Sequence, residues 1–446
     1  MKRKIYKQLI VWKNSIGRKP LIIRGARQVG KSYILNDFGK NEFKNYHIFD
    51  FEKNKNQLMQ VFEKSLEPQT IIKNLSLLLN KNISIKEDLI VFDEIQNCPR
   101  ALASLKYFNE NLSAAVCAAG SLLGITLSEE SFPVGQVTFL DMFPMSFEEF
   151  LFQYNNDMLL EAFEEGIKNK MLPVIAHQKL WEILKEYYIV GGMPEAVKTF
   201  QYYMDDKLTG FSKAREVQQN LLLTYMSDFN KHSGKINSLH ISSVFENVPR
   251  QLAQNGDYSV KRFRFKDAIR GKYRSSDFDG PINWLERAGL IHKVFPCRAI
   301  KIPLKSFTQD NIFKLYIFDT GLLNCMLEIS PQVLILQDYG TIKGFIAENL
   351  AVCEMKSSGE KNLYSWEHRN SEIEFIVNKK EKIIPIEVKS GRLTRAKSLQ
   401  QYRQMYSPLT EIIVSSGNLE FKDNGAIYCP LYYLGKLIEN IDSVID

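Results

Sequence analysis

Short apolar runs alternate with helix-like stretches along the N-terminal third of the chain. The apolar runs are typical of buried strands, whereas the stretches between them repeat their hydrophobic residues with a helical period. Expected strands lie at residues 20–24, 47–51, 89–94 and 114–119, and expected helices at 31–38 and 69–80. Strands that alternate with helices predict the α/β fold class with a parallel sheet.

The pattern becomes helical and amphipathic between residues 162 and 230. Three further expected helices lie at 241–254, 265–270 and 281–288, and strand-like residues follow at 290–295 and 314–318. Three helices followed by a hairpin with a long tip is the order of a winged-helix domain.

The last hundred residues combine helices and strands in another order. An expected helix at 344–350 precedes strands at 362–366, 372–377 and 383–389, a helix at 395–406 and a strand at 411–414. This α-β-β-β-α-β order predicts a further α/β domain at the C-terminal end.

Length and composition limit the class of protein. The chain has 446 residues, for which about three domains are the usual expectation. Hydrophobic residues make up 45% and aromatic residues 12%, which excludes a disordered or fibrous chain. No apolar run is long enough to span a bilayer, and Lys7, Gln8 and Lys13 interrupt the apolar part of the N-terminus. We therefore expect neither a membrane segment nor export.

The cysteines and the net charge add little to this assignment. The six cysteines form no CxxC pair and no zinc-binding spacing, so reduced thiols in a cytoplasmic protein explain them. A net charge of +7 is modest, and the places where basic residues cluster matter more than the total.

The sequence GARQVGKS at residues 25–32 follows the first expected strand and opens the first expected helix. Its spacing is that of a phosphate-binding loop, and a chance match is the alternative. Gly25 and Gly30 let the backbone approach phosphate oxygens. Lys31 reaches the terminal phosphates, and Ser32 offers its hydroxyl to Mg²⁺. We expect ATP and Mg²⁺ as ligands, with the nucleotide bound by Gly25, Ala26, Arg27, Gln28, Val29, Gly30, Lys31 and Ser32 together with Asp93.

An apolar strand that ends in Asp93 and Glu94 predicts the second half of this site. Asp93 is expected to hold Mg²⁺ through water, and Glu94 to orient or polarise the attacking water, as phosphoryl transfer to water requires. The alternative is a strand that merely ends in surface acids. The expected strand at 114–119 leads to Ser121, which we place beside these acids as a sensor of the γ-phosphate.

Several runs of residues make a family resemblance specific. They are GARQVGKS, LIVFDEIQ at 89–96, AAGS at 118–121, FPMSFEEF at 143–150 and YIVGGMPEAV at 188–197. Together they resemble a prokaryotic family of AAA-type, STAND-like P-loop ATPases, and the resemblance covers nearly the whole chain. It implies an ATPase with a C-terminal domain of unassigned role that often contains a nuclease-like fold. Ser146 and Glu149 also form a capping box, which gives that run a purely structural explanation.

One position departs from the family. A basic residue usually follows the glycine in the segment before the FPMSFEEF run, and here that position is Gln136. Arg24 and Arg27 are the nearest substitutes for a catalytic arginine finger. Each of them also fits a structural ion pair.

These patterns divide the chain into four expected domains. They are a P-loop ATPase core at 1–160, a helical lid over the nucleotide at 161–235, a winged-helix domain at 236–335 and a nuclease-like domain at 336–446. The implied function is ATP hydrolysis that controls a nucleic-acid-directed C-terminal domain. The alternative is a nucleotide-gated scaffold or sensor whose degenerate nuclease-like domain only binds a partner. The sequence leaves the oligomeric state open.

The C-terminal domain resembles the restriction-endonuclease-like fold, in which an acid and an E-x-K triplet on the next strand hold a divalent metal. The resemblance assigns Glu348, Glu374 and Glu387 to the metal. It assigns Lys389 to the attacking water, as a catalytic residue. The triplet alone carries no weight, because Glu42-Phe43-Lys44 matches it too. Glu374 departs from the more usual aspartate, and the alternative is a degenerate fold kept for binding or architecture.

A basic cluster with interleaved aromatic residues lies within the expected winged helix. It contains Lys261, Arg262, Phe263, Arg264, Phe265, Lys266, Arg270, Lys272, Tyr273 and Arg274. Such side chains suit phosphate backbones and stacked bases, so we expect a nucleic-acid partner, DNA rather than RNA. Arg392, Arg395 and Lys397 are expected to hold the phosphate backbone near the nuclease-like site. The alternative is a solvated face whose aromatic rings turn to the core.

Overall fold

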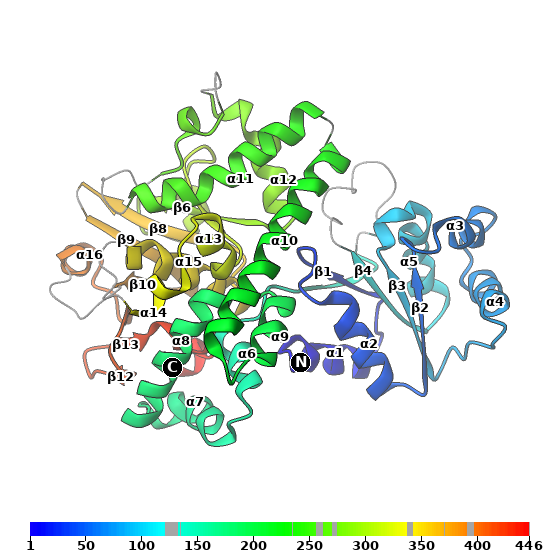
Figure 1. The fold of residues 1–446 in the computed structure, drawn as a ribbon, viewed down its shortest axis with the longest axis horizontal. Helices are drawn as coiled ribbons and strands as arrows, with labels where there is room; N and C mark the ends of the chain where they lie inside the picture. Colours follow the sequence, from blue (N-terminus) through cyan, green and yellow to red (C-terminus); the bar gives the residue numbers. More distant parts are fainter. Residues whose placement is uncertain are drawn as a thin grey trace. The chain divides into compact units, whose positions relative to one another are not determined.

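A computed structural model describes residues 1–120, 133, 135–233, 235–255, 262–269, 274–336, 342–369, 371–389 and 397–445 (Figure 1). These residues form two compact units, Met1–Phe143 and Pro144–Asp446. Each unit is built around one sheet. No helix among the described residues is long and apolar enough to cross a membrane.

The first unit contains a parallel sheet with the strand order β2-β3-β4-β1-β5. Its strands are β1 (Leu21–Arg24), β2 (Asn45–Asp50), β3 (Asp88–Asp93), β4 (Ala115–Gly120) and β5 (Thr138–Asp141). This confirms the predicted parallel α/β core, and β5 is a fifth strand beyond the four predicted. Because the strands are parallel, their carboxyl ends share one edge of the sheet, which is where such sheets bind ligands.

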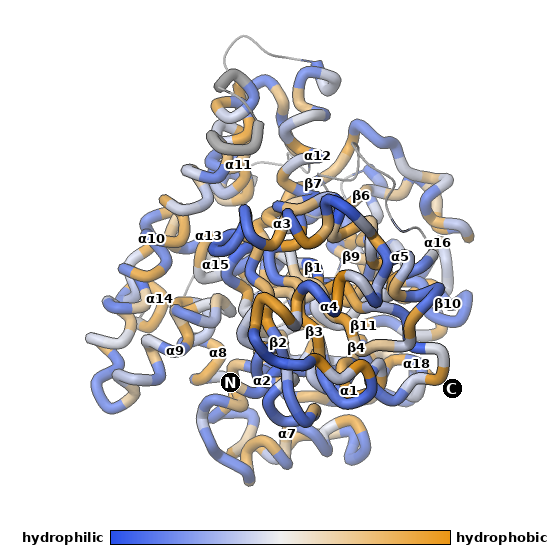
Figure 2. Tube along the Cα trace, turned by 90° about the vertical axis from the view of Figure 1, so that its right-hand side faces the viewer, coloured by the Kyte–Doolittle hydropathy of each residue, from blue (hydrophilic) through white to orange (hydrophobic). Residues whose placement is uncertain are grey.

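Helices cover this sheet and supply its hydrophobic core. They are α1 (Ile5–Asn14), α2 (Lys31–Glu42), α3 (Lys55–Glu63), α4 (Pro68–Leu79) and α5 (Pro99–Asn111). The ring of Phe92 on β3 lies 5.7 Å from that of Phe62 on α3 and 6.2 Å from that of Phe108 on α5. Figure 2 shows β3 and β4 as largely hydrophobic, as expected for strands buried on both faces.

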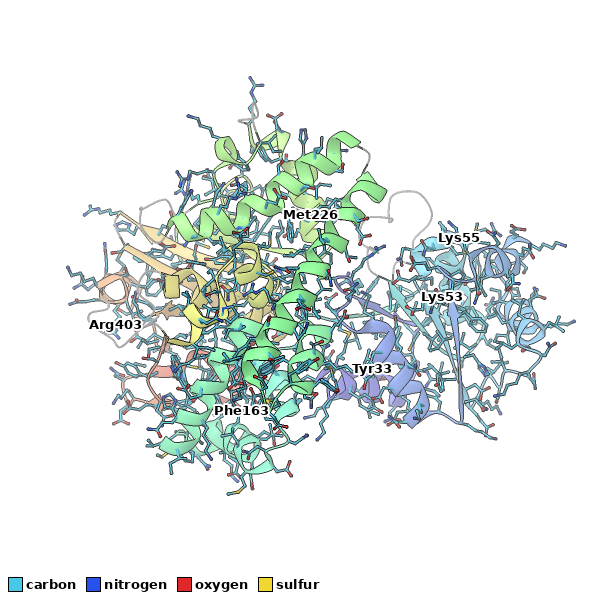
Figure 3. The ribbon with its side chains drawn as sticks, in the orientation of Figure 1. Tyr33, Lys53, Lys55, Phe163, Met226 and Arg403 are labelled. Atoms are coloured by element: carbon cyan, nitrogen blue, oxygen red, sulfur yellow. The ribbon has the colours of Figure 1, made fainter. Side chains whose placement is uncertain are left out.

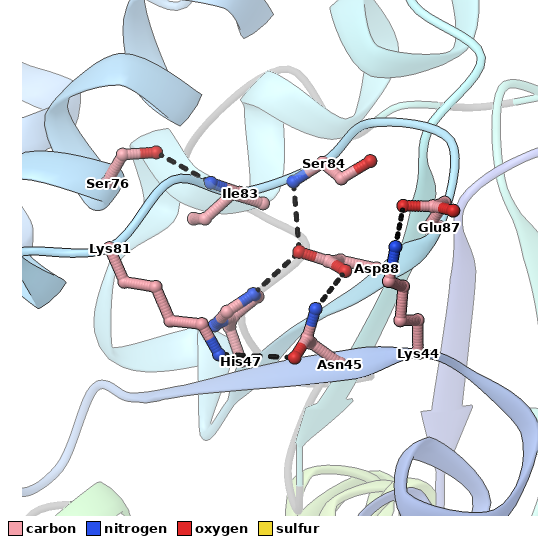
Figure 4. Close-up of polar contacts among 9 residues, drawn as sticks. All are labelled: Lys44, Asn45, His47, Ser76, Lys81, Ile83, Ser84, Glu87 and Asp88. Atoms are coloured by element: carbon pink, nitrogen blue, oxygen red, sulfur yellow. Dashed lines mark hydrogen bonds and ion pairs between the residues drawn. The ribbon is translucent and has the colours of Figure 1, made fainter.

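A buried polar network joins β2 to β3 at the amino ends of these strands (Figure 4). Asp88 Oδ2 lies 3.0 Å from His47 Nε2 and accepts a hydrogen bond from the Ser84 N–H at 2.9 Å. The amide of Asn45 donates to Asp88 Oδ1 at 2.9 Å. Burial raises the pKa of Asp88, but these hydrogen bonds outweigh it and leave the pKa below its usual value. The network satisfies a buried carboxylate and lies at the opposite end of the strands from Asp93.

The second unit begins with helices and carries others between its strands. They include α6 (Phe147–Leu151), α7 (Asp157–Asn169), α8 (Val174–Val190), α9 (Pro194–Tyr202), α10 (Lys207–Ser233), α11 (Lys235–Asn255), α12 (Asp279–Arg287), α13 (Thr320–Met326), α14 (Pro331–Leu336), α15 (Ile342–Ser357), α16 (Lys397–Tyr406), α17 (Leu434–Glu439) and α18 (Ile441–Val444). The predicted capping box opens α6, with Ser146 and Glu149 each bonded to the other's backbone N–H. Glu354 of α15 accepts a further hydrogen bond from the Phe147 N–H at 2.7 Å. The FPMSFEEF run therefore has a structural role at the start of this unit.

The YIVGGMPEAV run forms the close connection between α8 and α9. Gly191 has a φ of +69°, and a Cβ there would lie 2.4 Å from the Asp319 carboxylate. The Gly192 N–H donates to Asp319 Oδ2 at 2.6 Å, while its carbonyl accepts from the Met145 N–H at 2.7 Å. Only glycine fits where these backbone segments meet.

Asp319 should make the stability of this unit pH-dependent. Its carboxylate is buried, and burial raises its pKa from 3.8 to about 6 despite hydrogen bonds from backbone N–H groups. Between these two pH values Asp319 ionises in the unfolded chain but stays protonated in the folded protein. The free energy of unfolding that protonated Asp319 contributes at low pH is therefore lost as the pH rises.

Relative to Asp319→Asn, the wild-type protein should therefore lose about 3 kcal/mol of unfolding free energy between pH 3.8 and pH 6. Urea unfolding of both proteins across this range measures the difference directly, because every other titrating group is shared. A difference that does not change with pH would rule out this role for Asp319.

The second unit contains an eight-stranded sheet with the order β12-β13-β11-β10-β9-β8-β6-β7. Its strands are β6 (Ile291–Cys297), β7 (Lys314–Ile317), β8 (Leu363–His368), β9 (Ser371–Lys379), β10 (Lys382–Val388), β11 (Glu411–Ser415), β12 (Glu420–Phe421) and β13 (Ala426–Pro430). The observed order from α15 to β11 agrees with the predicted α-β-β-β-α-β order. The restriction-endonuclease-like fold itself is not confirmed.

The predicted winged helix is not confirmed either. Its two expected strands are present as the antiparallel pair β6 and β7, but β6 also pairs in parallel with β8 through Val294 and Leu363. The hairpin is thus part of the same sheet as the C-terminal strands. This sheet therefore contains strands from both sides of the domain boundary predicted at residue 336. A local pattern cannot distinguish a terminal hairpin from one that continues a larger sheet, because the pairing partner lies about 70 residues away along the chain.

Candidate functional site

The predicted phosphate loop connects the end of β1 to the start of α2. A Cβ on Gly25 would lie 2.1 Å from the carbonyl oxygen of Met142, so only glycine fits there. Gly30 forms the N-cap of α2 with a left-handed φ of +98°, which side chains disfavour. Ser32 is exposed in the first turn of α2, and Gln28 is exposed in the loop with a φ of +63°. The loop therefore has the backbone shape that its glycine spacing predicts.

Lys31 is almost completely buried within this loop. Its Nζ donates hydrogen bonds to the carbonyl oxygens of Gly25 at 2.9 Å and Ala26 at 2.7 Å. Burial lowers the pKa of Lys31 to about 8, although Glu94 and Asp93 oppose this shift. The ammonium is thus held by weak neutral acceptors beside two acids, and a phosphate would be a stronger partner for it.

The two predicted acids lie at the carboxyl end of β3. Asp93 is its last residue and is buried, and Glu94 follows with a left-handed φ of +51°. Burial raises the pKa of Glu94, while Lys31 and a hydrogen bond from the Gln96 amide lower it in part. The structure therefore brings Lys31, Asp93 and Glu94 together, and Glu94 has the raised proton affinity that suits a general base.

The arginine-finger candidates have different surroundings. The Arg24 guanidinium makes two hydrogen bonds to the Asp141 carboxylate, at 2.8 and 2.9 Å, and lies 4.5 Å from the Phe139 ring centre. These contacts favour a structural ion pair for Arg24. The charge of Arg27 acts on both Lys31 and Glu94. Gln136 accepts a hydrogen bond from Asn109, and Ser121 lies outside the described residues.

A second cluster of charged residues lies in the C-terminal sheet. Lys389, just after β10, has its Nζ 2.5 Å from Glu387 Oε1 and 3.9 Å from Glu374 Oε1. Glu374 also accepts a hydrogen bond from the Val388 N–H at 3.0 Å. The structure thus brings together Glu374, Glu387 and Lys389, which the sequence assigned to one site.

Of the two carboxylates of this cluster, Glu387 is buried and Glu374 is half-buried. Burial raises the pKa of Glu374 to about 8, Lys389 opposes the shift, and nearby glutamates including Glu348 add to it. Glu387 is 1% exposed, and its Oε2 has no hydrogen-bond partner among the residues that the structure describes. A buried carboxylate oxygen without a partner costs free energy, so this oxygen is available to a donor or a cation.

Glu348 is held at the side of this cluster by Lys314, a residue that the sequence pattern does not assign to the site. Its Oε2 accepts a hydrogen bond from the Tyr316 hydroxyl at 2.7 Å and lies 3.6 Å from Lys314 Nζ. Lys314 Nζ also lies 2.6 Å from Glu372 Oε1. Burial lowers the pKa of Lys314, but Tyr316 and the two glutamates together raise it well above its ordinary value. Across the described part of the chain, no three His, Cys, Asp or Glu side chains are arranged to hold a metal ion.

The aromatic residues of the basic cluster face inward where the structure describes them. The Phe265 ring contacts Phe278 at 5.2 Å and Phe313 at 5.9 Å, and Phe263 is buried against both Phe265 and Phe313. The buried ring of Phe263 is therefore not available to stack on bases, whereas Phe265 is half-buried. Arg262 forms an ion pair with Glu367 at 3.0 Å. Lys261, Arg270, Lys272, Tyr273, Arg392 and Arg395 lie outside the described residues.

Two cations of the C-terminal sheet region differ in their surroundings. Lys397 is exposed at the start of α16. Arg403 lies farther along the same helix (Figure 3). It is paired with Glu411 on β11. Of these two, Lys397 is the one placed to meet an external anion.

Comparison with protein families separates the chain into three matched segments. An AAA domain model matches residues 17–151. Two models described as domains of unknown function, DUF8612 and DUF4143, match residues 182–333 and 343–434. No curated protein matches.

The solved structures that match share little sequence with this chain. The Walker-type ATPase PABY2304 of Pyrococcus abyssi has 15% identity and a TM-score of 0.44, covering 73% of this chain and 95% of its own. Drosophila ORC bound to DNA has 13% identity and a TM-score of 0.28, covering 72% and 93%. A STAND protein of Pyrococcus horikoshii with a tetratricopeptide repeat sensor has 11% identity and a TM-score of 0.27, covering 80% and 45%.

The family match and the geometry agree on the N-terminal part of the chain. The matched residues 17–151 contain the phosphate loop, its buried Lys31 and the two acids at the end of β3. Over residues 17–151 the chain therefore matches an AAA domain, and its phosphate loop has the backbone shape of a P-loop.

Proposed function

We propose that the chain binds ATP with Mg²⁺ and hydrolyses it at the carboxyl edge of the N-terminal sheet. The observation that carries this proposal is the buried Lys31, which lies within the phosphate loop beside Asp93 and Glu94. A buried ammonium whose hydrogen bonds, among the described residues, go to neutral carbonyls is prepared to exchange them for phosphate oxygens.

Each residue of the loop has a defined task in this proposal. Backbone N–H groups between Gly25 and Ser32 bind the phosphates, and the N-terminus of α2 adds its positive dipole end. Lys31 binds the terminal phosphates. Ser32 and Asp93 would hold Mg²⁺, directly and through water, and the ion would offset the charge of the phosphates. The exposed Ser32 hydroxyl and the carboxylate of Asp93 are oxygen donors of the kind that Mg²⁺ prefers.

Glu94 orients the attacking water and accepts its proton. Burial raises the pKa of Glu94, so its carboxylate is a stronger base than a surface glutamate. Arg27 is our candidate for the cation that stabilises charge in the transition state, because Arg24 is committed to Asp141. Ser121 is proposed to contact the γ-phosphate.

Phosphate release by the full-length protein, measured with ATP and Mg²⁺, tests hydrolysis. A protein that binds ATP without releasing phosphate would contradict the proposed hydrolysis.

A second candidate function belongs to the C-terminal sheet, and we propose metal-dependent phosphodiester cleavage there under the control of the ATPase domain. Glu374 and Glu387 both approach the Lys389 ammonium, so their carboxylates face one point. Mg²⁺ is usually held by one or two carboxylates, with waters and substrate phosphates completing its shell. The buried, unpartnered Oε2 of Glu387 supplies such an oxygen, and the donor set therefore fits this ion.

In this candidate the metal, when bound, would polarise the phosphate and lower the pKa of water. Lys389, one-third exposed, would move from Glu387 toward the attacking water. The competing reading is a scaffold or sensor that binds a partner and cuts nothing. The ion pairs of Lys314 with Glu372 and of Lys389 with Glu387 support this binding-only alternative, because they already neutralise much of the negative charge of the glutamates.

Two substitutions separate these readings. Lys389→Ala should remove cleavage but keep metal binding, whereas Glu387→Gln should abolish metal binding, because it removes the carboxylate charge. Supercoiled and single-stranded DNA are the substrates, with Mg²⁺ or Mn²⁺ and with or without ATP. The metal-induced shift in melting temperature reports binding independently of cutting.

Lys422→Ala is the matched control, since this lysine forms an exposed pair with Glu420 in the same sheet. It should leave both readouts unchanged. No cleavage in any condition, together with no metal-induced shift for the wild-type protein, would leave the binding-only reading.

A further inference from the structure

Arg3 precedes α1 and is buried, although two lysines flank it in the sequence. Its Nη1 donates a hydrogen bond to the Val29 carbonyl at 2.8 Å, and its Nη2 donates to the Phe143 carbonyl at 2.7 Å. Val29 belongs to the phosphate loop, and Phe143 is the last residue of the first unit. Arg3 lies outside the AAA domain match, which begins at residue 17.

The bond to Val29 fixes the direction of a peptide group in the loop. In a trans peptide the carbonyl and the next N–H point in opposite directions, so a Val29 carbonyl turned toward Arg3 turns the Gly30 N–H away from it. Gly30 has a left-handed φ of +98°, and glycine backbones change conformation readily. A phosphate loop must keep its N–H groups facing the ligand. Arg3 therefore holds the Val29–Gly30 peptide in one of its two orientations.

The bond to Phe143 gives Arg3 a fixed anchor. The preceding residue, Met142, donates its N–H to the Arg24 carbonyl at 2.7 Å, and its own carbonyl lies against Gly25. The segment after β5 therefore borders the phosphate loop at Gly25 and, through Arg3, at Val29.

The N-terminal segment that carries Arg3 is itself attached along α2. Tyr33 lies in the first turn of α2 (Figure 3). Its hydroxyl accepts a hydrogen bond from the Met1 amino group at 2.7 Å. The Tyr6 hydroxyl donates to Glu42 Oε1, at the other end of α2, at 3.1 Å. With contacts at both ends of this helix, the Arg3 guanidinium has little freedom to leave the two carbonyls.

We propose that Arg3 is a positioning residue for nucleotide binding, which joins the Val29–Gly30 peptide to Phe143 and so keeps the Gly30 N–H directed at the phosphates. This inference rests on the proposed ATP binding. The planar guanidinium suits the task because it presents two N–H donors in a fixed geometry, which a lysine ammonium cannot reproduce.

The test compares Arg3→Gln, Arg3→Lys and Lys7→Gln in the full-length protein. Lys7 is exposed on α1, so Lys7→Gln removes the same charge near the N-terminus without touching the loop. Titration with a fluorescent ATP analogue gives the Kd, and thermal unfolding of the free proteins reports folding. Arg3→Gln should weaken binding about tenfold while Lys7→Gln leaves it unchanged. Arg3→Lys, which keeps the charge, should be intermediate.

Three outcomes would overturn the inference. One is equal affinity for Arg3→Gln and the wild-type protein. Another is equal weakening in Arg3→Gln and Lys7→Gln, which would reveal a general charge effect. The third is a lower melting temperature for Arg3→Lys with wild-type affinity, which would reveal a purely structural role and remains measurable if Arg3→Gln fails to fold. A folded wild-type protein that binds no ATP would instead contradict the proposed function.

Discussion

Replacing Lys31 with alanine should weaken ATP binding by at least about 100-fold, because the variant loses a charge-assisted contact to the terminal phosphates. In the free protein the ammonium is buried, and its hydrogen bonds within the described part of the chain go to two loop carbonyls. Alanine removes the cation but leaves the backbone of the loop, whose shape depends on Gly25 and Gly30. Titration with a fluorescent ATP analogue in the presence of Mg²⁺ measures the change.

Lys40→Ala is the control for this substitution. Lys40 lies on the same helix as Lys31, but its side chain is exposed. It should bind ATP with wild-type affinity and show a similar melting temperature. If both variants bound equally well, Lys31 would have no special role in nucleotide binding.

Glu94→Gln should have a different effect, with ATP binding retained and turnover lowered by about 100-fold or more. Glutamine keeps the size of the side chain and its contact with Gln96, but it cannot accept a proton from water. The phosphate loop and Lys31 remain intact, so the Kd for ATP should stay near that of the wild-type protein. The measurements are phosphate release at saturating ATP and the same titration as for Lys31.

Glu87→Gln is the matched control, because Glu87 is an exposed carboxylate just before β3 whose ion pair with Lys44 contributes little. It should retain full turnover. Equal loss of binding in Lys31→Ala and Glu94→Gln would contradict the separate roles assigned to these residues.

The nucleotide half of the site is predictable from sequence because its geometry is local. The spacing from Gly25 to Ser32 determines a loop between one strand and one helix, and both elements appear in the structure. The position of Asp93 follows from the topology, since the carboxyl ends of parallel strands share an edge. The residues within a few positions of each of these side chains are therefore enough to predict where it lies.

The contacts that position these residues come from distant parts of the chain. Gly25 is required by the carbonyl of Met142, and the Val29 carbonyl is held by Arg3. Neither contact can be recognised in the sequence. Arg3 stands between two lysines, in a stretch whose pattern predicts the exposed start of a helix. Burial of a cation in such a run can be known only from the folded arrangement.

The C-terminal sheet shows the same division between local and distant information. The order of its elements and the meeting of Glu374, Glu387 and Lys389 follow from strand alternation in two neighbouring strands. Lys314 comes from β7, which the sequence places in a separate winged helix, and its approach to Glu348 depends on the pairing of β6 with β8. In the sequence, Lys314 stands out as a lysine at the start of an otherwise apolar strand.

The most direct test of nucleotide binding at the phosphate loop is a binding isotherm of the full-length wild-type protein with ATP, recorded with Mg²⁺ and again with a chelator. We expect one ATP bound per chain, with tighter binding when Mg²⁺ is present, because Ser32 and Asp93 would hold the ion against the phosphates. Circular dichroism on the same sample establishes that the protein is folded. A folded protein that shows no saturable ATP binding in either condition would contradict the assignment of the phosphate loop.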